Sequence, residues 1–410
     1  MKESSKIIND PLYGFISLQG GIILSLVEHP YFQRLRRISQ LGLTSLVYPG
    51  ALHTRFHHAI GAMHLMQKAI NVLRSKGHDI SDKEAEGAKI AILLHDIGHG
   101  AYSHALEHSI VDHVTHEELS LFYMDRLNDE FDGRLDLAIE IFKDEYPKSY
   151  LHQLVSSQLD MDRMDYLNRD SFYSGVQEGI IGAERIINML DVVNNKLVVE
   201  SKGIYSVEKF LIARRLMYWQ VYFHKTVVSA EQMLIKILQR AKELSQNNVE
   251  LFGTSSFQLF LKNNFSIEDF KSNPKVFEAF TELDDYDIMA SIKEWQNHPD
   301  KILSTLSNII AKRKLFKVKL LDKPLEANVV SKAKKNIIES YDIDAKNVDY
   351  FFLEGEITNN AYKLNDSDIN ILFKDNITKD LMEAADKSTV SALCKTVKKY
   401  FYCFPKNQHI

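Results

Sequence analysis

Residues 90–94 (IAILL) form an apolar run that leads directly into His95-Asp96. The run is too apolar for a surface helix and predicts a helix at the centre of the fold. Asp82 is its candidate N-cap, and the helix should end near His95. A charged pair placed directly after five apolar residues is costly to bury unless it binds a metal or another charge. A buried helix-terminal histidine capped by its neighbour is the alternative reading.

The surrounding sequence also has helical periodicity. Apolar residues recur at helical spacing from His58 to Leu73, and long helices are expected from Val207 to about Leu244. A short β-hairpin is expected at 197–205, around a Ser-Lys-Gly turn. After residue 312 the pattern changes, with strands expected at 314–321, 350–358, 369–373 and 400–404 and helices at 331–341 and 389–398. The sequence therefore predicts a mainly α fold, with a helical catalytic domain at 1–311 and a small α+β C-terminal lobe at 312–410.

Composition limits the class of protein. With 45% hydrophobic and 26% charged residues the chain is globular, and its net charge of −5 makes nucleic-acid binding an unfavoured function. Its two cysteines, Cys394 and Cys403, indicate a reducing compartment rather than a disulfide framework. No apolar segment resembles a signal peptide or a membrane span, so a cytoplasmic location is expected. Histidine is the informative residue, because 11 of the 16 lie between His53 and His116.

A metal site can be assembled around His95 and Asp96. Adjacent helical residues point about 100° apart, so the pair can meet at one ion only with help from other segments. His58 and Asp162 are candidates to supply that help. Two imidazoles and two carboxylates suit one divalent transition metal, Fe, Mn, Ni, Zn or Co. Such an ion polarises a phosphoryl oxygen and lowers the pKa of a water, which predicts a metal-dependent phosphohydrolase.

A candidate general acid or base follows the His-Asp pair. His104 and Glu107 are three residues apart and would share a helix face, where the carboxylate can orient the imidazole. An ordinary surface His–Glu pair is the alternative. His116 is less specific, because Thr115 and Glu118 have the spacing of a capping box, which explains this segment without chemistry.

Six motifs, in order and at similar spacing, resemble a known family. They are 33–36 (QRLR), 40–42 (QLG), 48–51 (YPGA), 55–58 (RFHH), 95–100 (HDIGHG) and 162–170 (DRMDYLNRD). They resemble the HD-domain deoxynucleoside triphosphate triphosphohydrolases, which include bacterial dGTPase-like enzymes and the vertebrate SAM-and-HD-domain enzyme. The match covers roughly the first 240 residues. It implies an HD-domain helical body and hydrolysis of a dNTP at the α-phosphorus to deoxynucleoside and inorganic triphosphate.

The resemblance also implies roles for individual residues. His58, His95, Asp96 and Asp162 would hold the metal, and Mg²⁺ can accompany the substrate. The implied catalytic residues are His104, Glu107 and His116. The implied substrate-binding residues are Arg55, His99, His116 and Arg163 for phosphates, Gln40, Leu41, Tyr166 and Asp170 for deoxyribose, and Arg214, Tyr222 and Lys225 for phosphates and base. Plain core aromatics at Tyr166 and Tyr222, and a solvated helix face at Arg214, are the alternatives.

Family members that assemble on binding nucleotide carry segments similar to the N-terminus of this chain. Lys6, Asn9, Gln33 and Arg36 match those segments, which bind an activating guanine nucleotide between subunits. Glu28 stands where those members have Asp, which lengthens the side chain that would read the base. Ordinary helix salt bridges of Arg34, Arg36 and Arg37 explain part of the pattern equally well. A homo-oligomer, dimer or tetramer, is expected from the resemblance.

Two other functions compete with dNTP hydrolysis. One is an HD phosphohydrolase acting on another phosphoester, such as a nucleoside monophosphate or an alarmone, for which the sugar-pocket set would be unnecessary. The other is a catalytically silent nucleotide-sensing module, which the intact candidate metal and acid–base residues disfavour.

Overall fold

The computed structural model describes residues 5–18, 20–103, 109–111, 114–362, 368–385 and 393–408. His104 and Glu107, the candidate acid–base pair, lie outside the described residues. Within the described part, no helix combines the length and the apolarity needed to cross a bilayer.

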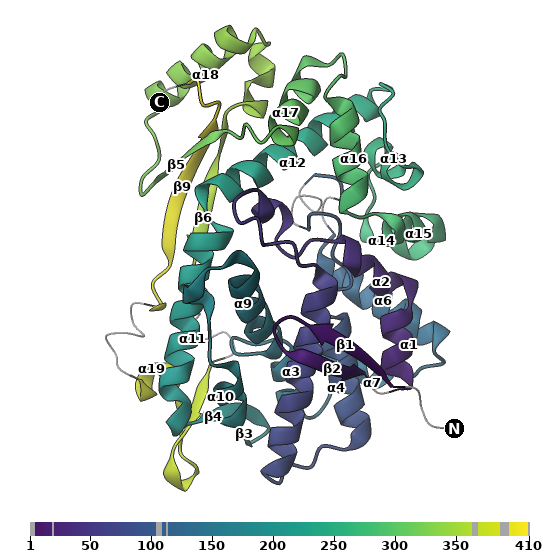
Figure 1. The fold of residues 1–410 in the computed structure, drawn as a ribbon, viewed down its shortest axis with the longest axis vertical. Helices are drawn as coiled ribbons and strands as arrows, with labels where there is room; N and C mark the ends of the chain where they lie inside the picture. Colours follow the sequence, from purple (N-terminus) through teal and green to yellow (C-terminus); the bar gives the residue numbers. More distant parts are fainter. Residues whose placement is uncertain are drawn as a thin grey trace.

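Helices build most of the molecule, which confirms the mainly α prediction (Figure 1). The body consists of α1 (Ile22–Glu28), α2 (Pro30–Gln33), α3 (Arg55–Ser75), α4 (Asp82–Leu94), α6 (His116–Glu130), α7 (Asp136–Phe142), α8 (Ser149–Val155), α9 (Met161–Ser174), α10 (Ala183–Asn188), α11 (Ile204–Met217), α12 (Lys225–Gln246), α13 (Ser255–Lys262), α14 (Ile267–Ser272), α15 (Pro274–Glu282), α16 (Asp285–Trp295) and α17 (Lys301–Ala311). A π-helical turn, Tyr218–Tyr222, joins α11 to α12.

The apolar run that precedes His95 forms α4, as predicted. All five residues of 90–94 are at most 1% exposed, and α4 packs beside α3, which in turn packs on α9. The N-cap is Ser81, not Asp82, because the Ser81 hydroxyl accepts from the Glu84 N–H and the Glu84 carboxylate accepts from the Ser81 N–H. This capping box fixes the start of the helix that carries His95 at its other end.

Replacing Glu84 with glutamine should destabilise the protein in a pH-dependent way. Burial opposes ionisation of Glu84, but Lys148, the Ser81 groups and Tyr146 together lower its pKa to about 2. Because the folded pKa is depressed, the carboxylate stabilises the fold fully above its unfolded pKa of about 4.5, and that contribution is lost as the pH falls toward 2. We expect Glu84→Gln to cost about 1–2 kcal/mol at pH 7 and less at pH 3, measured by chemical denaturation. An equal loss at both pH values would contradict the stabilising role of this charge.

Two hairpins flank the helical body. β1 (Lys6–Asp10) pairs antiparallel with β2 (Gly14–Leu18), a hairpin that the sequence reading missed. β3 (Leu190–Val193) pairs with β4 (Lys196–Glu200) through a turn at Asn194-Asn195, so the hairpin predicted at 197–205 is displaced. The predicted Ser-Lys-Gly turn is instead a 3-10 turn that leads into α11.

The C-terminal segment forms a second, smaller assembly of helix and sheet, as predicted. β5 (Lys317–Leu321), β9 (Val397–Phe404) and β6 (Leu353–Asn359) make an antiparallel sheet in the order β5-β9-β6, accompanied by α18 (Ala327–Tyr341) and seen at the upper left of Figure 1. The prediction of a helix at 389–398 is wrong for its last residues, because β9 begins at Val397. Residues 386–392 lie outside the described part.

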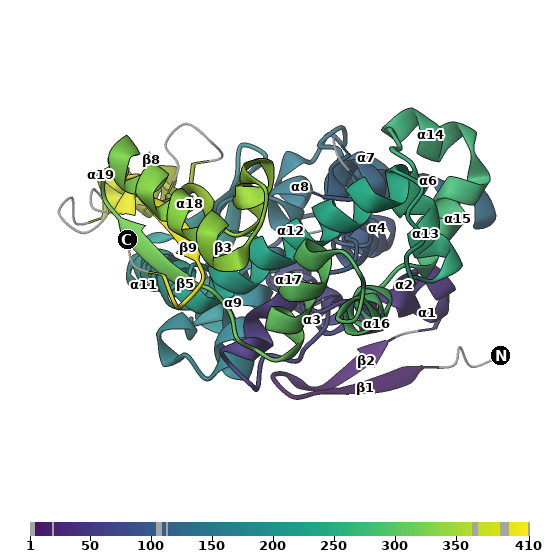
Figure 2. The same ribbon diagram turned by 90° about the horizontal axis from the view of Figure 1, so that it is seen from above.

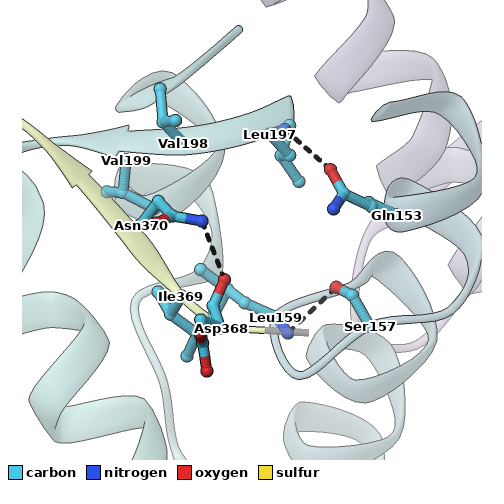
Figure 3. A pocket seen from close by; sticks show the side chains of 9 residues that line it. All are labelled: Gln153, Ser157, Leu159, Leu197, Val198, Val199, Asp368, Ile369 and Asn370. Carbon is cyan, nitrogen blue, oxygen red and sulfur yellow. Dashed lines mark hydrogen bonds between the residues drawn. The ribbon is translucent and has the colours of Figure 1, made fainter. Parts of the chain in front are cut away.

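The same segment also extends the sheet of the body. β7 (Asn370–Leu372) pairs parallel with β4 and antiparallel with β8 (Thr378–Asp380), which leads into α19 (Leu381–Ala384). The division at residue 312 therefore stays a prediction. A cavity of about 20 Å³ lies at this joint and has room for about one water molecule, so it is not a substrate pocket. Figure 3 shows its lining, Gln153, Ser157, Leu159, 197–199 and 368–370.

Candidate metal centre and substrate pocket

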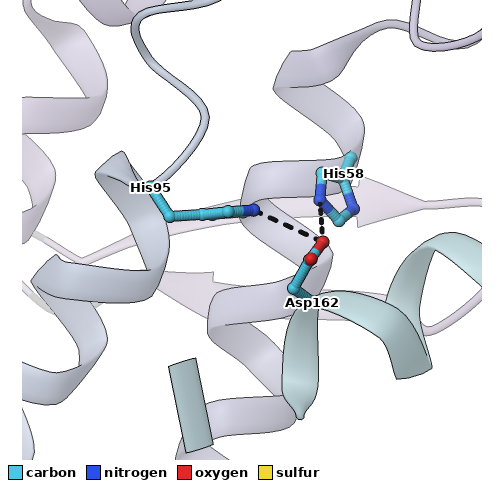
Figure 4. A group of neighbouring side chains, drawn as sticks. All are labelled: His58, His95 and Asp162. Atoms are coloured by element: carbon cyan, nitrogen blue, oxygen red, sulfur yellow. Dashed lines mark ion pairs between the residues drawn. The ribbon is translucent and has the colours of Figure 1, made fainter. Parts of the chain in front are cut away.

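Three predicted metal ligands converge from three different helices. His58 belongs to α3, His95 follows the last residue of α4, and Asp162 lies in the first turn of α9. The Asp162 Oδ1 atom is 3.0 Å from His58 Nε2 and 3.4 Å from His95 Nε2. Figure 4 shows both imidazoles directed at this carboxylate. The group therefore brings together residues that are more than 30 positions apart in the sequence.

The free nitrogen atoms of this group fit a bound cation. His58 Nε2 and His95 Nε2 are both buried and make no hydrogen bond to any of the described residues, even though a carboxylate is nearby. Their other nitrogens are held, His58 Nδ1 at 2.8 Å from Asp165 Oδ2 and His95 Nδ1 at 2.6 Å from the Ile92 carbonyl oxygen. Metal–ligand bonds of about 2.1 Å place neighbouring ligand atoms about 3.0–3.4 Å apart. The distances from Asp162 Oδ1 to the two imidazoles have this spacing.

The local charge also favours a cation between the two imidazoles. Burial works against a charged His58, but Asp162 and Asp165 raise its pKa to about 10. Burial likewise opposes ionisation of Asp162, yet the two imidazoles hold the pKa of its carboxyl well below the usual range. The electrostatic potential beside the two Nε2 atoms is therefore set mainly by carboxylates. A negative potential of this kind favours binding of a divalent cation.

The fourth predicted ligand, Asp96, lies at the edge of this group. Its Oδ1 is 3.4 Å from His95 Nε2, and its Oδ2 is 3.8 Å from His58 Nε2. Asp96 is also ion-paired with Arg55, whose Nε and Nη2 donate to the Ser103 hydroxyl. Arg55, a predicted phosphate contact, is thus positioned directly beside the metal group.

The turn that carries His95 and Asp96 is held by close backbone packing. A Cβ atom on Gly98 would lie 2.3 Å from the His116 carbonyl oxygen and 2.3 Å from the Ser120 nitrogen, so only glycine fits. Arg34 is 1% exposed and donates to the carbonyls of Ile97 at 3.3 Å and His99 at 2.7 Å. The alternative of an ordinary helix salt bridge is therefore wrong for Arg34, whose guanidinium holds this turn instead.

Two further histidines lie next to Asp96. His99 Nε2 is 3.3 Å from Asp96 Oδ1, and its ring stacks on His116 with centroids 3.9 Å apart. Burial and the nearby Arg55 guanidinium lower the pKa of His99 to about 3, so this imidazole is neutral. The capping box expected at Thr115 is present, with the Thr115 hydroxyl accepting from the Glu118 N–H. His116 therefore combines a structural position at the start of α6 with proximity to the predicted phosphate site.

A cavity of about 560 Å³ opens beside the metal group. Seven of the eleven predicted substrate-binding residues line it: Gln40, Leu41, Arg55, Arg163, Tyr166, Asp170 and Tyr222. The Tyr166 ring lies 6.4 Å from the His58 ring, which puts this wall of the pocket next to the metal ligands. A volume of this size is typical of small-molecule sites.

The predicted sugar end of the pocket contains a network that the sequence reading missed. His53 Nε2 lies 2.8 Å from Asp170 Oδ1, and the Tyr222 hydroxyl donates to Asp170 Oδ2 at 2.6 Å. His53 is 1% exposed and stacks on Tyr173. Asp170 is thus fixed from both sides. His53 lies in the histidine-rich segment that the sequence singled out, but nothing in the sequence linked it to Asp170, which is 117 positions away.

Some predicted pocket residues lie elsewhere, and others were missed. Arg214 is buried and donates to the Ala361 carbonyl at 3.3 Å, and Lys225 is exposed at the start of α12; neither lines the pocket. The C-terminal sheet supplies Glu356, Ile357 and Phe401 to the pocket wall. No motif in the sequence of this segment indicated that role.

The candidate activator residues lie on and beside the N-terminal hairpin. Lys6 Nζ pairs with Glu28 at 2.9 Å, and Arg36 Nε donates to Gln33 Oε1 at 2.8 Å, while Asn9 lies within β1. Arg37 pairs with Asp284, which is 247 positions away, so this pair is not the helix salt bridge of the alternative reading. Allosteric nucleotide binding here stays a prediction.

Comparison with known proteins places this site in a family. Residues 181–261, from α10 into α13, match a family model described as an HD associated region. A crystal structure of a phosphohydrolase from Bacteroides thetaiotaomicron is 53% identical and superposes with a TM-score of 0.94, covering 98% of this chain and 100% of that one.

Two sequence relatives agree with this result. The uncharacterized protein YwfO of Bacillus subtilis is 34% identical over 319 residues, 76% of this chain and 71% of the relative. The zebrafish (Danio rerio) deoxynucleoside triphosphate triphosphohydrolase SAMHD1 is 25% identical over 481 aligned positions, 99% of this chain and 75% of the relative. The helical fold and the His-His-Asp group are those of an HD phosphohydrolase. The chain belongs to the dNTPase-like family of HD-domain proteins.

Proposed function

We propose that this protein hydrolyses deoxynucleoside triphosphates at the α-phosphorus and releases deoxynucleoside and inorganic triphosphate. The observation that carries the proposal is the position of the pocket. It lies beside the metal group, since its lining residue Arg55 pairs with Asp96 and the Tyr166 ring is 6.4 Å from the His58 ring. The four residues implied for the sugar, Gln40, Leu41, Tyr166 and Asp170, all line it. A phosphatase without sugar selectivity has no need of this set. The relative named as a dNTP triphosphohydrolase supports the same substrate class.

The proposed reaction gives each group of residues at the site a separate role. His58, His95, Asp162 and Asp96 would hold one divalent cation, which supplies Lewis acidity and lowers the pKa of a water. Arg55 and Arg163 line the pocket beside these ligands and would bind the phosphate oxygens. His104, with Glu107 as its acidic partner, would move a proton to the leaving 5′-oxygen. Phosphoryl transfer depends mainly on such positioning and charge stabilisation.

The sugar end would set selectivity for deoxyribose. Asp170 is fixed by His53 and Tyr222 and would accept a hydrogen bond from the 3′-hydroxyl. Tyr166 lines the same pocket as Asp170, with its ring 6.4 Å from the His58 ring, and would collide there with a 2′-hydroxyl. Steric exclusion by a rigid aromatic ring discriminates more strongly than the loss of one weak contact.

Product analysis tests this proposal. The purified protein is incubated with each dNTP and each NTP in Mn²⁺ or Mg²⁺, and the phosphate products are separated by ion-exchange chromatography. We expect inorganic triphosphate from dNTPs and at least about tenfold slower release from NTPs. Release of monophosphate or diphosphate would contradict attack at the α-phosphorus and favour hydrolysis of another phosphoester.

A further inference from the structure

His58 stands at one end of a row of charged side chains that leads away from the metal group. Its Nδ1 is 2.8 Å from Asp165 Oδ2. The Asp165 carboxylate accepts two hydrogen bonds from Arg169, from Nε at 2.9 Å and Nη2 at 3.0 Å. Arg169 Nη1 then donates to Asp10 Oδ2 at 2.8 Å. The row runs from α3 through α9 to the turn of the β1–β2 hairpin.

Every charge in this row is buried. Asp165 and Arg169 are 0% exposed and Asp10 is 3% exposed. A buried charge depends on its partners, because water cannot replace them. Arg169 divides its donors between the two carboxylates, and the Tyr13 ring covers its guanidinium at 5.5 Å. Removing one carboxylate would therefore shift Arg169 toward the other.

Tight helix packing keeps Asp165 and Arg169 in one place. A Cβ atom on Gly61 of α3 would lie 2.1 Å from Asp165 Oδ1 and 2.2 Å from Arg169 Nη2. The ion pair thus fills the space that the absent side chain of Gly61 leaves between α3 and α9. Little room remains for either side chain to adjust without moving the other.

Asp10 connects this row to the hairpin. Its Oδ1 accepts from the N–H groups of Leu12 at 2.9 Å and Tyr13 at 3.0 Å, which closes the turn, while its Oδ2 binds Arg169. Figure 2 shows β1 and β2 along one edge of the molecule, outside the helical body. One carboxylate therefore ties a peripheral hairpin to a buried arginine.

We propose that Asp10 is a positioning residue for the metal ligand His58, acting through Arg169 and Asp165, and that the hairpin is thereby part of the support of the metal centre. Asp10 fixes Arg169, Arg169 fixes the Asp165 carboxylate, and Asp165 holds the His58 ring with Nε2 directed at the metal position. The inference rests on the metal site of the proposed function but not on the identity of the substrate.

The test is the affinity of the metal-free protein for Mn²⁺, measured by isothermal titration without substrate. Asp10→Asn keeps an oxygen for the turn but removes the charge that faces Arg169. We expect it to weaken Mn²⁺ binding about three- to tenfold, less than the 10–100-fold typical of a group in direct contact with a ligand. Asp165→Asn should produce that larger loss, and the double variant should bind no more weakly than Asp165→Asn alone, because both act along one path.

Asp300→Asn is the matched control. Asp300 also combines a backbone cap, to Leu303 N–H at 2.8 Å, with an arginine pair, to Arg240, but lies outside the metal centre. It should lose stability without losing Mn²⁺ affinity. Unchanged Mn²⁺ binding by Asp10→Asn, or an equal loss in Asp300→Asn, would overturn the proposal. If the wild-type protein binds no Mn²⁺, the metal site itself is wrong. The wild-type titration therefore separates failure of the metal site from failure of the role proposed for Asp10.

Discussion

Asp162→Ala is expected to abolish metal binding and hydrolysis together. In the cluster of His58, His95 and Asp162, the Asp162 carboxylate is the group that contacts both imidazoles. Its Oδ1 is 3.0 Å from His58 Nε2 and 3.4 Å from His95 Nε2. Without it, only the two imidazoles of the cluster remain, and Asp96 is ion-paired to Arg55. We expect the bound metal to fall below about a tenth of the wild-type content and turnover to fall about a thousandfold or more, since metal catalysis supplies several kcal/mol. Elemental analysis and a triphosphate-release assay measure the two effects.

The matched variant is His104→Ala, which should separate those effects. A general acid contributes about 10²–10⁴-fold to the rate, so turnover should fall while the metal content is unchanged. Full activity in His104→Ala would exclude this histidine as the acid or base. Undiminished metal in Asp162→Ala would exclude Asp162 as a ligand. Far-ultraviolet circular dichroism should show that both variants are folded.

Gly98→Ala is expected to have the largest effect on stability. The added Cβ would overlap two backbone atoms at 2.3 Å, and neither can move away as a flexible side chain could. We expect a loss of about 3 kcal/mol in the free energy of unfolding, measured with urea. Because this glycine lies between Asp96 and His99, metal content should fall as well.

Gly182→Ala is the control for that substitution. Gly182 has a φ of −82°, and the nearest atom to its added Cβ would be Arg185 Cβ at 3.9 Å. This change should alter stability by less than about 1 kcal/mol. If Gly98→Ala were as mild as Gly182→Ala, the turn would have to be more adaptable than its packing against α6 indicates.

Local sequence patterns predicted much of the fold, and two of the errors have local explanations. The hairpin turn lies at Asn194-Asn195, both with positive φ (50° and 62°), a conformation that asparagine tolerates better than most residues. Ser81 and Glu84 have the spacing of a capping box, which outweighs the propensity of Asp82. Both signals were present in the sequence.

Long-range contacts at the site could not be predicted in the same way. The Asp165–Arg169 pair follows from its i,i+4 spacing on α9, but its partner Asp10 is 159 positions from Arg169. Arg34 binds carbonyl groups in two distant segments, 65 and 249 residues away. Carbonyl acceptors have no residue identity, so no sequence pattern marks them. The candidate metal residues could be predicted from the charged pair that follows an apolar run and from motifs that resemble those of a family.

The position of β9 has a consequence for how the protein is made. Among the described strands, β9 is the central one of its sheet, between β5 and β6, and it supplies Phe401 to the substrate pocket. A ribosome that has already synthesised all of the metal-binding helices has not yet produced this strand. The nascent chain can therefore assemble its metal group before its pocket has a complete wall. We expect substrate binding to begin only after β9 has paired with β5 and β6.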